Sequence, residues 1–386
     1  MSRRGCGSGP LRSVRASRGR RDNSRQIAGR ATERAEQHCV EFVFLPGLED
    51  VVRTEITEQV AARNVFTVPE RRDAIQATWS GSLRPLFGLR TIVAAYLVVR
   101  FDIPRPRSLL SGEHFPRLLA ALHLARSLDP VDRAESFRFE AAGRDSTVFR
   151  LLAEQLVTAA GMVYAPEDGA SVIRFRRTTD RQGWDVLVRL GVRPLSARRW
   201  RHQGYRGAVN ATVAAAMVRL TDPQANDRVV NLMCGSGTLL VERLLAAPAR
   251  VAVGVDVAKE AIWACGENLA GAGLKGRALL FESDIADDAW VCSGPFDVML
   301  ADPPWGDKIG HHDTNEELHM LLLSRAYDVG APGARFAVLT HEIRVMANCL
   351  ERFQDRWLVD LEQKVFHKGH HPRIYLLRRV ACESAR

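Results

Sequence analysis

The sequence predicts an α/β protein whose C-terminal half, residues 210–386, forms a doubly wound sheet of mostly parallel strands. From about residue 210, strand-like runs, glycine turns and helical runs alternate, which is typical of consecutive βαβ units. The alternation ends with two strand-like runs, 359–366 and 373–379, that no helical run separates. We therefore expect seven strands, the last two forming an antiparallel hairpin that closes the sheet.

Local patterns predict the individual elements of this half. Short apolar runs bounded by turn residues indicate buried strands, because a parallel sheet is covered on both faces. The five strands expected before the hairpin are 228–232, 251–256, 278–281, 298–301 and 336–340. The first of them leads through a glycine turn into a helical run over residues 239–245.

The N-terminal half predicts two smaller α+β units, residues 39–99 and 100–200, in which strand-like and helical runs alternate. The expected strands are 40–45, 74–79, 92–101, 136–141, 172–176 and 184–190, and the expected helical runs are 48–62, 83–89, 115–124 and 148–162. Residues 201–209 are predicted to be a linker. Residues 1–38 are rich in Ser, Gly and Arg without hydrophobic periodicity, which predicts a disordered basic arm.

The composition excludes several classes of protein. The chain of 386 residues is 46% hydrophobic and 26% charged, which is ordinary for a globular protein. No apolar run approaches the ~20 residues that span a bilayer, so no membrane segment is expected. The seven cysteines include no Cys-x-x-Cys pair, which favours a reducing compartment, the cytoplasm. No metal site is expected, because no Cys or acid completes a zinc-ligand spacing with His311-His312 or His370-His371.

The net charge of +9 suggests an anionic partner, nucleic acid first. The excess lies in residues 1–38 and 100–210, each with a net charge of +7, whereas residues 211–386 carry −4. Codon bias raises the Arg content of a chain without a functional cause, but a uniform bias does not by itself produce this division. We therefore expect docking through the N-terminal half, with candidate contacts at Arg174, Arg176, Arg177, Arg198, Arg199 and Arg201.

A glycine-rich turn follows the first strand of the C-terminal half. Glycine lets the backbone approach a ligand closely, and the N-terminus of the next helix offers free N–H groups. Taken alone, the turn is equally consistent with a tight strand-to-helix connection. Its residues are Asn231, Leu232, Met233, Cys234, Gly235, Ser236, Gly237 and Thr238.

Acidic residues at the ends of the next two strands extend this pattern. Asp256 ends the second strand, where a carboxylate can accept hydrogen bonds from two ribose hydroxyls. Asp284 follows the third strand and can accept from an adenine amino group. Either acid alone is more simply a helix cap. A dinucleotide-binding fold has a similar arrangement, but Leu240 stands where its glycine fingerprint needs a third glycine.

The string Asp302-Pro303-Pro304-Trp305 follows the fourth strand. Two prolines cannot continue a central strand, because they lack N–H donors, so they form a rigid corner. The Asp302 carboxylate and the Pro303 carbonyl are both acceptors, and together they can hold the two hydrogens of an exocyclic amine. Trp305 offers a face on which a planar base can stack.

In this order and spacing, the motifs of residues 210–380 resemble those of class I S-adenosylmethionine-dependent methyltransferases that act on amino groups. The resemblance implies a Rossmann-like domain with S-adenosylmethionine (SAM) as cofactor. It assigns catalysis to Asp302, Pro303, Pro304 and Trp305. The residues it implies for cofactor binding are Asn231, Cys234, Gly235, Ser236, Gly237, Thr238, Asp256, Val257, Asp284 and Ile285.

The N-terminal half narrows the resemblance. Residues 137–141, Phe-Arg-Phe-Glu-Ala, and the helical run that follows resemble a THUMP RNA-binding domain, preceded by a ferredoxin-like piece. With the run 202–220, the chain is similar to THUMP-containing RNA guanine-N2 methyltransferases. That family acts mostly on guanosine in the acceptor stem of tRNA, and some members need a small activator subunit. The implied partners are therefore RNA, first of all tRNA, and such a subunit.

Two details of this family bear on the cofactor site. The segment with Asn210 and Thr212 is implied to pack over the methionine end of SAM. The family usually has Asp-Pro where this chain has Asn231-Leu232. Losing that charge predicts weaker cofactor binding, by ~1–2 kcal/mol for a charge-assisted hydrogen bond made neutral.

Three other functions remain open on the sequence. A DNA amino-methyltransferase shares the catalytic motif, but its target-recognition region usually follows or interrupts the catalytic part. A protein glutamine methyltransferase usually has Asn where Asp302 stands. A non-catalytic RNA-binding protein with a decayed cofactor site is suggested by Asn231.

Overall fold

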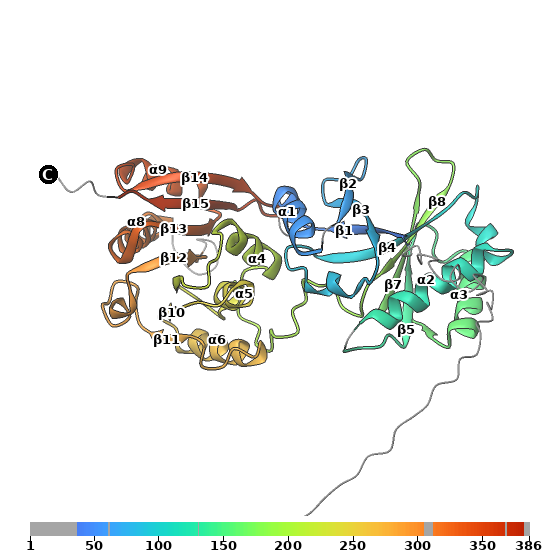
Figure 1. Ribbon diagram of the computed structural model, residues 1–386, viewed down its shortest axis with the longest axis horizontal. Helices are drawn as coiled ribbons and strands as arrows, with labels where there is room; N and C mark the ends of the chain where they lie inside the picture. Colours follow the sequence, from blue (N-terminus) through green and yellow to red (C-terminus); the bar gives the residue numbers. More distant parts are fainter. Residues whose placement is uncertain (1–36, 61, 130, 305–311, 367–368, 382–386) are drawn as a thin grey trace, which may run out of the picture. The chain divides into compact units, whose positions relative to one another are not determined.

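The computed structural model describes residues 37–60, 62–129, 131–304, 312–366 and 369–381 (Figure 1). The predicted arm, residues 1–38, lies outside this part of the chain except for its last two residues. Gln37 and His38 begin the first strand, opposite Ser80 and Trp79, so this strand starts three residues before the predicted run 40–45.

The first sheet has eight strands in the order β2-β3-β1-β4-β8-β7-β5-β6. β4 and β8 pair antiparallel, from Tyr96 opposite Arg189 to Phe101 opposite Trp184. The strands of residues 39–99 and 100–200 therefore continue one another in a single sheet. Their bounds are β1 (Gln37–Val43), β2 (Arg63–Thr67), β3 (Ala74–Ser80), β4 (Ala94–Phe101), β5 (Ser136–Glu140), β6 (Val163–Tyr164), β7 (Ser171–Arg177) and β8 (Trp184–Arg189).

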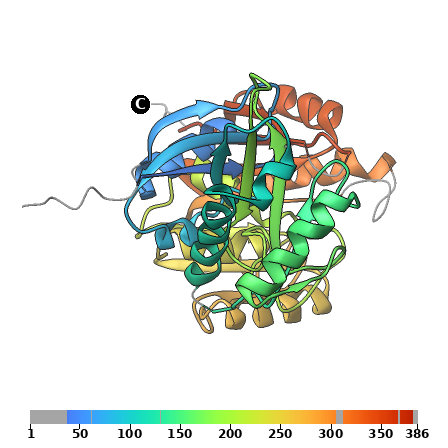
Figure 2. The ribbon, with the colours of Figure 1, turned by 90° about the vertical axis from the view of Figure 1, so that its right-hand side faces the viewer.

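Three helices cover one face of this sheet: α1 (Glu49–Val60), α2 (His114–Leu128) and α3 (Thr147–Ala160). Figure 2 shows α2 in teal and α3 in green lying over the strands. Strand alternation supplies the apolar side, as in β5, where Phe137 and Phe139 are buried and Arg138 faces the other way. The predicted helix 83–89 is a 3-10 helix, Arg84–Gly88, and a second one spans Pro106–Leu110.

Two strands of this sheet escape the sequence prediction. β2 is an edge strand whose residues are mostly exposed, so it lacks the buried positions that mark a strand. β6 has only two residues. Both lie at the ends of the sheet, where a strand pairs on one side only.

The second sheet has the seven strands that the sequence predicts, in the order β11-β10-β9-β12-β13-β15-β14. The first five are parallel, and β15 pairs antiparallel with both β13 and β14, which confirms the closing hairpin. The bounds are β9 (Arg228–Leu232), β10 (Val251–Asp256), β11 (Leu279–Glu282), β12 (Phe296–Ala301), β13 (Gly330–Thr340), β14 (Trp357–Lys364) and β15 (Arg373–Arg379).

Helices cover both faces of the second sheet, as expected for a doubly wound fold. Alternate strand residues such as Val229, Val298 and Leu300 pack with helix α4, and their neighbours such as Val230 and Met299 pack with α8 and α9. The helices are α4 (Ala211–Leu220), α5 (Thr238–Ala246), α6 (Lys259–Gly271), α8 (His312–Val329) and α9 (Ile343–Arg352), and a 3-10 turn spans Val291–Ser293.

The strand order reverses between β9 and β12, which are neighbours in space although β10 and β11 separate them in the chain. Doubly wound sheets bind ligands at this point, beyond the carboxyl ends of the strands. Leu232 lies opposite Ala301, the last residues of their strands. The glycine turn and Asp302 therefore leave the sheet next to each other.

Candidate active site

The glycine turn after β9 has a backbone that few residues can adopt. Gly235 and Gly237 have φ values of +52° and +77°, and Met233 has +51°. A Cβ atom on Gly237 would lie 2.3 Å from the Cys265 sulfur, so both the backbone and the space require glycine there. A strained turn that neighbouring elements hold in place is typical of a ligand-binding site.

Cys234 faces the protein interior. It is buried, and its hydrogen bond with the Cys265 thiol, together with burial, raises the pKa of the Cys234 thiol well above its usual value. The thiol stays neutral and does not act as a nucleophile. At the end of the glycine turn, Thr238 begins α5, and its hydroxyl accepts a hydrogen bond from Arg201 at 2.7 Å.

Asp256 joins the turn to the end of β10. Its carboxylate accepts hydrogen bonds from the backbone N–H groups of Gly235 at 2.8 Å and Ala258 at 3.0 Å. Each oxygen retains a further lone pair that can accept from a ligand hydroxyl. The next side chain, Val257, is apolar yet 70% exposed, so it offers an uncovered hydrophobic surface beside the carboxylate.

Asp284 lies beyond β11, on the far side of Asp256 from the turn. Its carboxylate accepts from the N–H of Ala286 at 2.9 Å, in an exposed loop. Ile285 is buried, and its carbonyl accepts from Arg325 at 2.9 Å, which holds the loop against α8.

Asn231 is buried at the end of β9, and the structure shows why an amide stands there. Its Nδ2 donates to the carbonyls of Leu300 at 3.1 Å and Leu232 at 3.3 Å, which a carboxylate cannot do. Its Oδ1 has no hydrogen-bond partner, nor has the buried hydroxyl of Ser236 in the turn. Two orphaned polar atoms in one buried turn indicate a polar ligand.

Asn210 and Thr212 have a structural role at the start of α4. The Asn210 side chain accepts from the Thr212 N–H at 2.8 Å and from its hydroxyl at 2.6 Å, a helix cap. Thr212 is fully buried. The implied contact of both residues with the cofactor stays a prediction.

Asp302, Pro303 and Pro304 follow β12 at the switch point, with Pro303 buried and the other two half-buried. Trp305 lies outside the described residues, so its predicted stacking role stays a prediction. The neighbouring strand β13 ends in Thr340, whose hydroxyl lies 3.1 Å from Nε2 of the buried His319. Burial lowers the pKa of His319, and its Nδ1 lies 2.7 Å from the Asn315 carbonyl. This neutral histidine ties α8 to β13 beside the motif.

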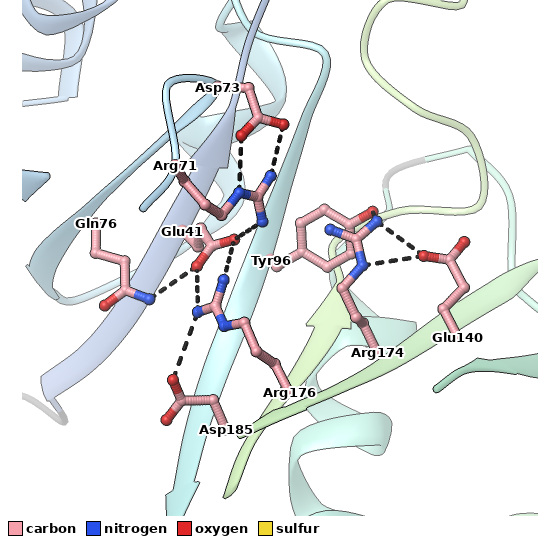
Figure 3. Close-up of polar contacts among 9 residues, drawn as sticks. All are labelled: Glu41, Arg71, Asp73, Gln76, Tyr96, Glu140, Arg174, Arg176 and Asp185. Atoms are coloured by element: carbon pink, nitrogen blue, oxygen red, sulfur yellow. Dashed lines mark hydrogen bonds and ion pairs between the residues drawn. The ribbon is translucent and has the colours of Figure 1, made fainter. Parts of the chain in front are cut away.

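Three of the predicted nucleic-acid contacts lie on β7, and two of them, Arg174 and Arg176, pair with acids (Figure 3). Arg174 forms an ion pair with Glu140 at 2.8 Å and stacks over a tyrosine ring. Arg176 pairs with the fully buried Glu41 at 2.8 Å. Arg177 is the exposed member, with its guanidinium over the Trp184 ring.

The other three lie after β8. The side chain of Arg198 is 6% exposed and forms an ion pair with the buried Glu242, which contradicts its prediction as a contact for an external phosphate. Arg199 pairs with Asp129 at 2.9 Å at the surface. Arg201 is half-buried and donates to the Val209 carbonyl and to α5.

The predicted linker, residues 201–209, is part of the site. Arg198, Arg201 and Gln203 hold it against α5 and α6, and Tyr205 rests on the glycine turn. We call residues 198–210 the strap. The sequence offered one local sign of a role for this segment, Tyr205 between Gly204 and Gly207, and that pattern alone predicts only a loop.

Within the ranges described, no group of three or more His, Cys, Asp or Glu side chains is arranged to hold a metal ion. In the same part of the chain, no helix combines the length and apolar character needed to cross a bilayer.

Comparisons with known proteins show that the C-terminal part of the chain is similar to methyltransferase domains. Residues 198–373, which include the strap, match the family described as UPF0020: RMKL-like, methyltransferase domain. A tRNA (guanine(6)-N2)-methyltransferase of Thermus thermophilus is 28% identical over 87% of this chain and 98% of its own length. A tRNA (guanine(6)-N2)-methyltransferase of Archaeoglobus fulgidus is 24% identical over 40% of this chain and 45% of its own. The crystal structure of TrmN from Thermus thermophilus superposes with a TM-score of 0.69 at 23% identity, covering 89% of this chain and 100% of that one.

The residues at the switch point fit SAM, the methyl donor of such domains. The glycine turn leaves the backbone accessible, Asn231 and Ser236 have polar atoms without partners, and Asp256 has lone pairs to spare. Methionine, ribose and adenine groups need such donors and acceptors beside an apolar surface. Residues 198–373 of this chain, which match the UPF0020 family model, therefore form a SAM-dependent methyltransferase domain.

Proposed function

We propose that the chain methylates the exocyclic N2 amine of a guanosine in RNA, most simply in the acceptor stem of a tRNA. One observation carries the proposal: the tRNA guanine-N2 methyltransferase of Thermus thermophilus aligns over 98% of its length. Relatives with other substrates, a release factor glutamine methyltransferase and an rRNA N(6)-adenosine methyltransferase, align over only 28% and 26% of this chain. The likeness to the guanine-specific enzyme therefore extends into the N-terminal half.

The proposed chemistry depends on position more than on acid–base catalysis. SAM, when bound, supplies an electrophilic methyl group. The N2 lone pair of guanine is delocalised into the ring, so the amine is a weak nucleophile. Hydrogen bonds from the amine to the Asp302 carboxylate and the Pro303 carbonyl localise the lone pair on N2 and orient the amine for methyl transfer. Asp302 can accept the proton after transfer, and Trp305 would stack against the base.

The N-terminal half is proposed to dock the RNA as a ferredoxin-like and a THUMP-like unit. Arg177 and Arg199 are the candidates of the original six that reach the surface, although Arg199 is paired with Asp129. A phosphate would compete for these guanidinium groups, which bind phosphates in a two-point geometry. A cytoplasmic location and an activator subunit are parts of the same proposal.

Methyl transfer from labelled SAM tests the proposal. The full-length protein is incubated in parallel with total tRNA, total DNA and total protein, and labelled RNA is digested to nucleosides. We expect label in tRNA, recovered as N2-methylguanosine. Label in DNA or protein with none in tRNA would refute the proposal.

A matched substrate sharpens the test. Once the methylated nucleotide is located, the same tRNA is made with inosine at that position. Inosine keeps the ring and the sugar of guanosine but lacks the N2 amine, so transfer should stop. Continued methylation of the inosine transcript would exclude N2 as the acceptor.

A further inference from the structure

We propose that Tyr205 is a cofactor-binding residue, held over the glycine turn by the strap of residues 198–210. The proposal rests on the methyltransferase domain and SAM, and it is independent of the RNA substrate. It assigns a ligand contact to a segment that the sequence predicts to be a linker.

Two arginines anchor the first part of the strap to α5, the helix that the glycine turn opens. Arg198 pairs with Glu242 at 2.8 Å, and Arg201 donates to the Thr238 hydroxyl at 2.7 Å. Residues 238 and 242 are one helical turn apart, so both contacts lie along one side of α5. Glu242 and Thr238 are almost completely buried, and buried ion pairs and hydrogen bonds of this kind fix geometry.

A buried amide then ties the strap to the turn itself. Asn268 on α6 accepts from the Gln203 N–H at 3.0 Å through its side-chain oxygen. Its Nδ2 donates to the carbonyls of Ser236 at 3.0 Å and Gln203 at 3.3 Å. One side chain therefore links the strap two residues before Tyr205 with the middle of the turn. On the other side of Tyr205, the Val209 carbonyl accepts from Arg201 at 2.9 Å.

Tyr205 lies directly on the turn between these anchors. A Cβ atom on Gly235 would lie 3.6 Å from Cδ1 and 3.7 Å from Cε1 of the ring, which is van der Waals contact. Burial raises the pKa of the Tyr205 phenol, and the negative charge of Asp256 raises it further. Tyr205 thus lies on Gly235, whose N–H donates to the Asp256 carboxylate at 2.8 Å.

The fold places Tyr205 at the edge of the sheet where ligands bind. Gly235 lies in the turn that follows β9, and Asp256 ends β10, the parallel neighbour of β9; a doubly wound sheet binds its ligand at such strand ends. A ring held there by anchors on both sides loses little entropy when a ligand packs against it. The half-buried ring provides apolar surface, and its hydroxyl a hydrogen-bonding group, to a ligand in that crevice.

Calorimetric binding of SAM and S-adenosylhomocysteine to the full-length protein tests the proposal, with Tyr205→Ala and Tyr205→Phe beside the wild type. Loss of the ring should raise the Kd for both compounds by about tenfold, the equivalent of one aromatic contact. Tyr205→Phe keeps the ring and should stay close to wild type. The melting temperature without cofactor should not change in either variant, since the anchors of the strap remain.

Tyr164→Ala is the matched control. Tyr164 is also half-buried, but its ring packs on Phe137 and Phe139 in the first sheet. Its loss should lower the melting temperature and leave the Kd for SAM unchanged. Unchanged SAM affinity in Tyr205→Ala would overturn the proposal. So would a lowered affinity accompanied by the same fall in melting temperature as in the control, because that pattern indicates a structural role.

Discussion

The two sheets place their polar residues in opposite ways. In the seven-stranded sheet, polar groups gather at the carboxyl ends of the strands, and Asn231 and Ser236 each leave a buried atom without a partner. In the eight-stranded sheet, charged residues lie along the strands of one face and neutralise each other (Figure 3). Unsatisfied polar atoms mark a place for a ligand, whereas satisfied pairs stabilise the fold.

Glu41 shows how complete this pairing is. It is fully buried and accepts hydrogen bonds from Gln76 at 2.8 Å, Arg71 at 3.1 Å and Arg176 at 2.8 Å. One carboxylate on β1 therefore binds side chains from β3, from the loop before β3 and from β7. Arg176 also reaches Asp185 at 3.4 Å. A basic cluster in the sequence is therefore not necessarily a basic surface in the protein.

The largest effect should come from breaking this pairing. Glu41→Ala leaves the guanidinium groups of Arg71 and Arg176 without their shared buried partner, which should destabilise the fold by about 3–5 kcal/mol. Urea denaturation measures the free energy of unfolding. Asp102→Ala is the control, since Asp102 pairs with Arg100 at the surface and its loss should leave stability nearly unchanged. Equal stability of the two variants would show that the network contributes nothing.

Removing the acceptor at the end of β12 should affect catalysis and leave folding intact. Asp302→Ala should lower methyl transfer by roughly 10²–10³-fold, the usual effect of losing one positioned hydrogen-bonding group in an active site. SAM affinity should persist, because the cofactor residues lie at the ends of other strands. Single-turnover transfer and calorimetry measure the two effects. Wild-type transfer rates in this variant would remove Asp302 from the mechanism.

Asn231→Asp tests the meaning of the missing charge. The sequence comparison predicts tighter SAM binding for the acid, but the amide here donates to Leu300 and Leu232. An Asp side chain would oppose these carbonyls, so we expect a loss of about 1–3 kcal/mol in stability from the broken hydrogen bonds. Denaturation and SAM titration on the same sample separate the two effects. Tighter binding at unchanged stability would support the simpler view from the sequence.

The smallest effect should come from deleting residues 1–36, which stops short of strand β1. These residues carry much of the net positive charge, so their removal should weaken RNA binding at low salt by a few-fold and reduce its salt dependence. Turnover at saturating RNA should stay the same. A complete loss of methyl transfer would show that the arm is essential.

Much of the catalytic half could be predicted because its signals are local. The bounds of β9, β10 and β15 agree with the strand-like runs in the sequence, and the glycine turn and Asp302 lie at the strand ends where the motifs place them. Apolar periodicity and turn residues act within a few positions, and parallel strands bring their carboxyl ends to one edge. The N-terminal half carried weaker signals, since its strands pair across long distances in the chain.

The sequence by itself determined the order of the strands and helices and the motif residues of the methyltransferase domain, because these depend on local periodicity and turn chemistry. Only the tertiary structure decided that β4 and β8 join two units in one sheet, that Arg176 and Arg198 bind buried acids, and that Tyr205 lies on the glycine turn. Each of these depends on a partner that lies elsewhere in the chain. No local pattern identifies such a partner, because burial and pairing arise only when the sheets and helices pack.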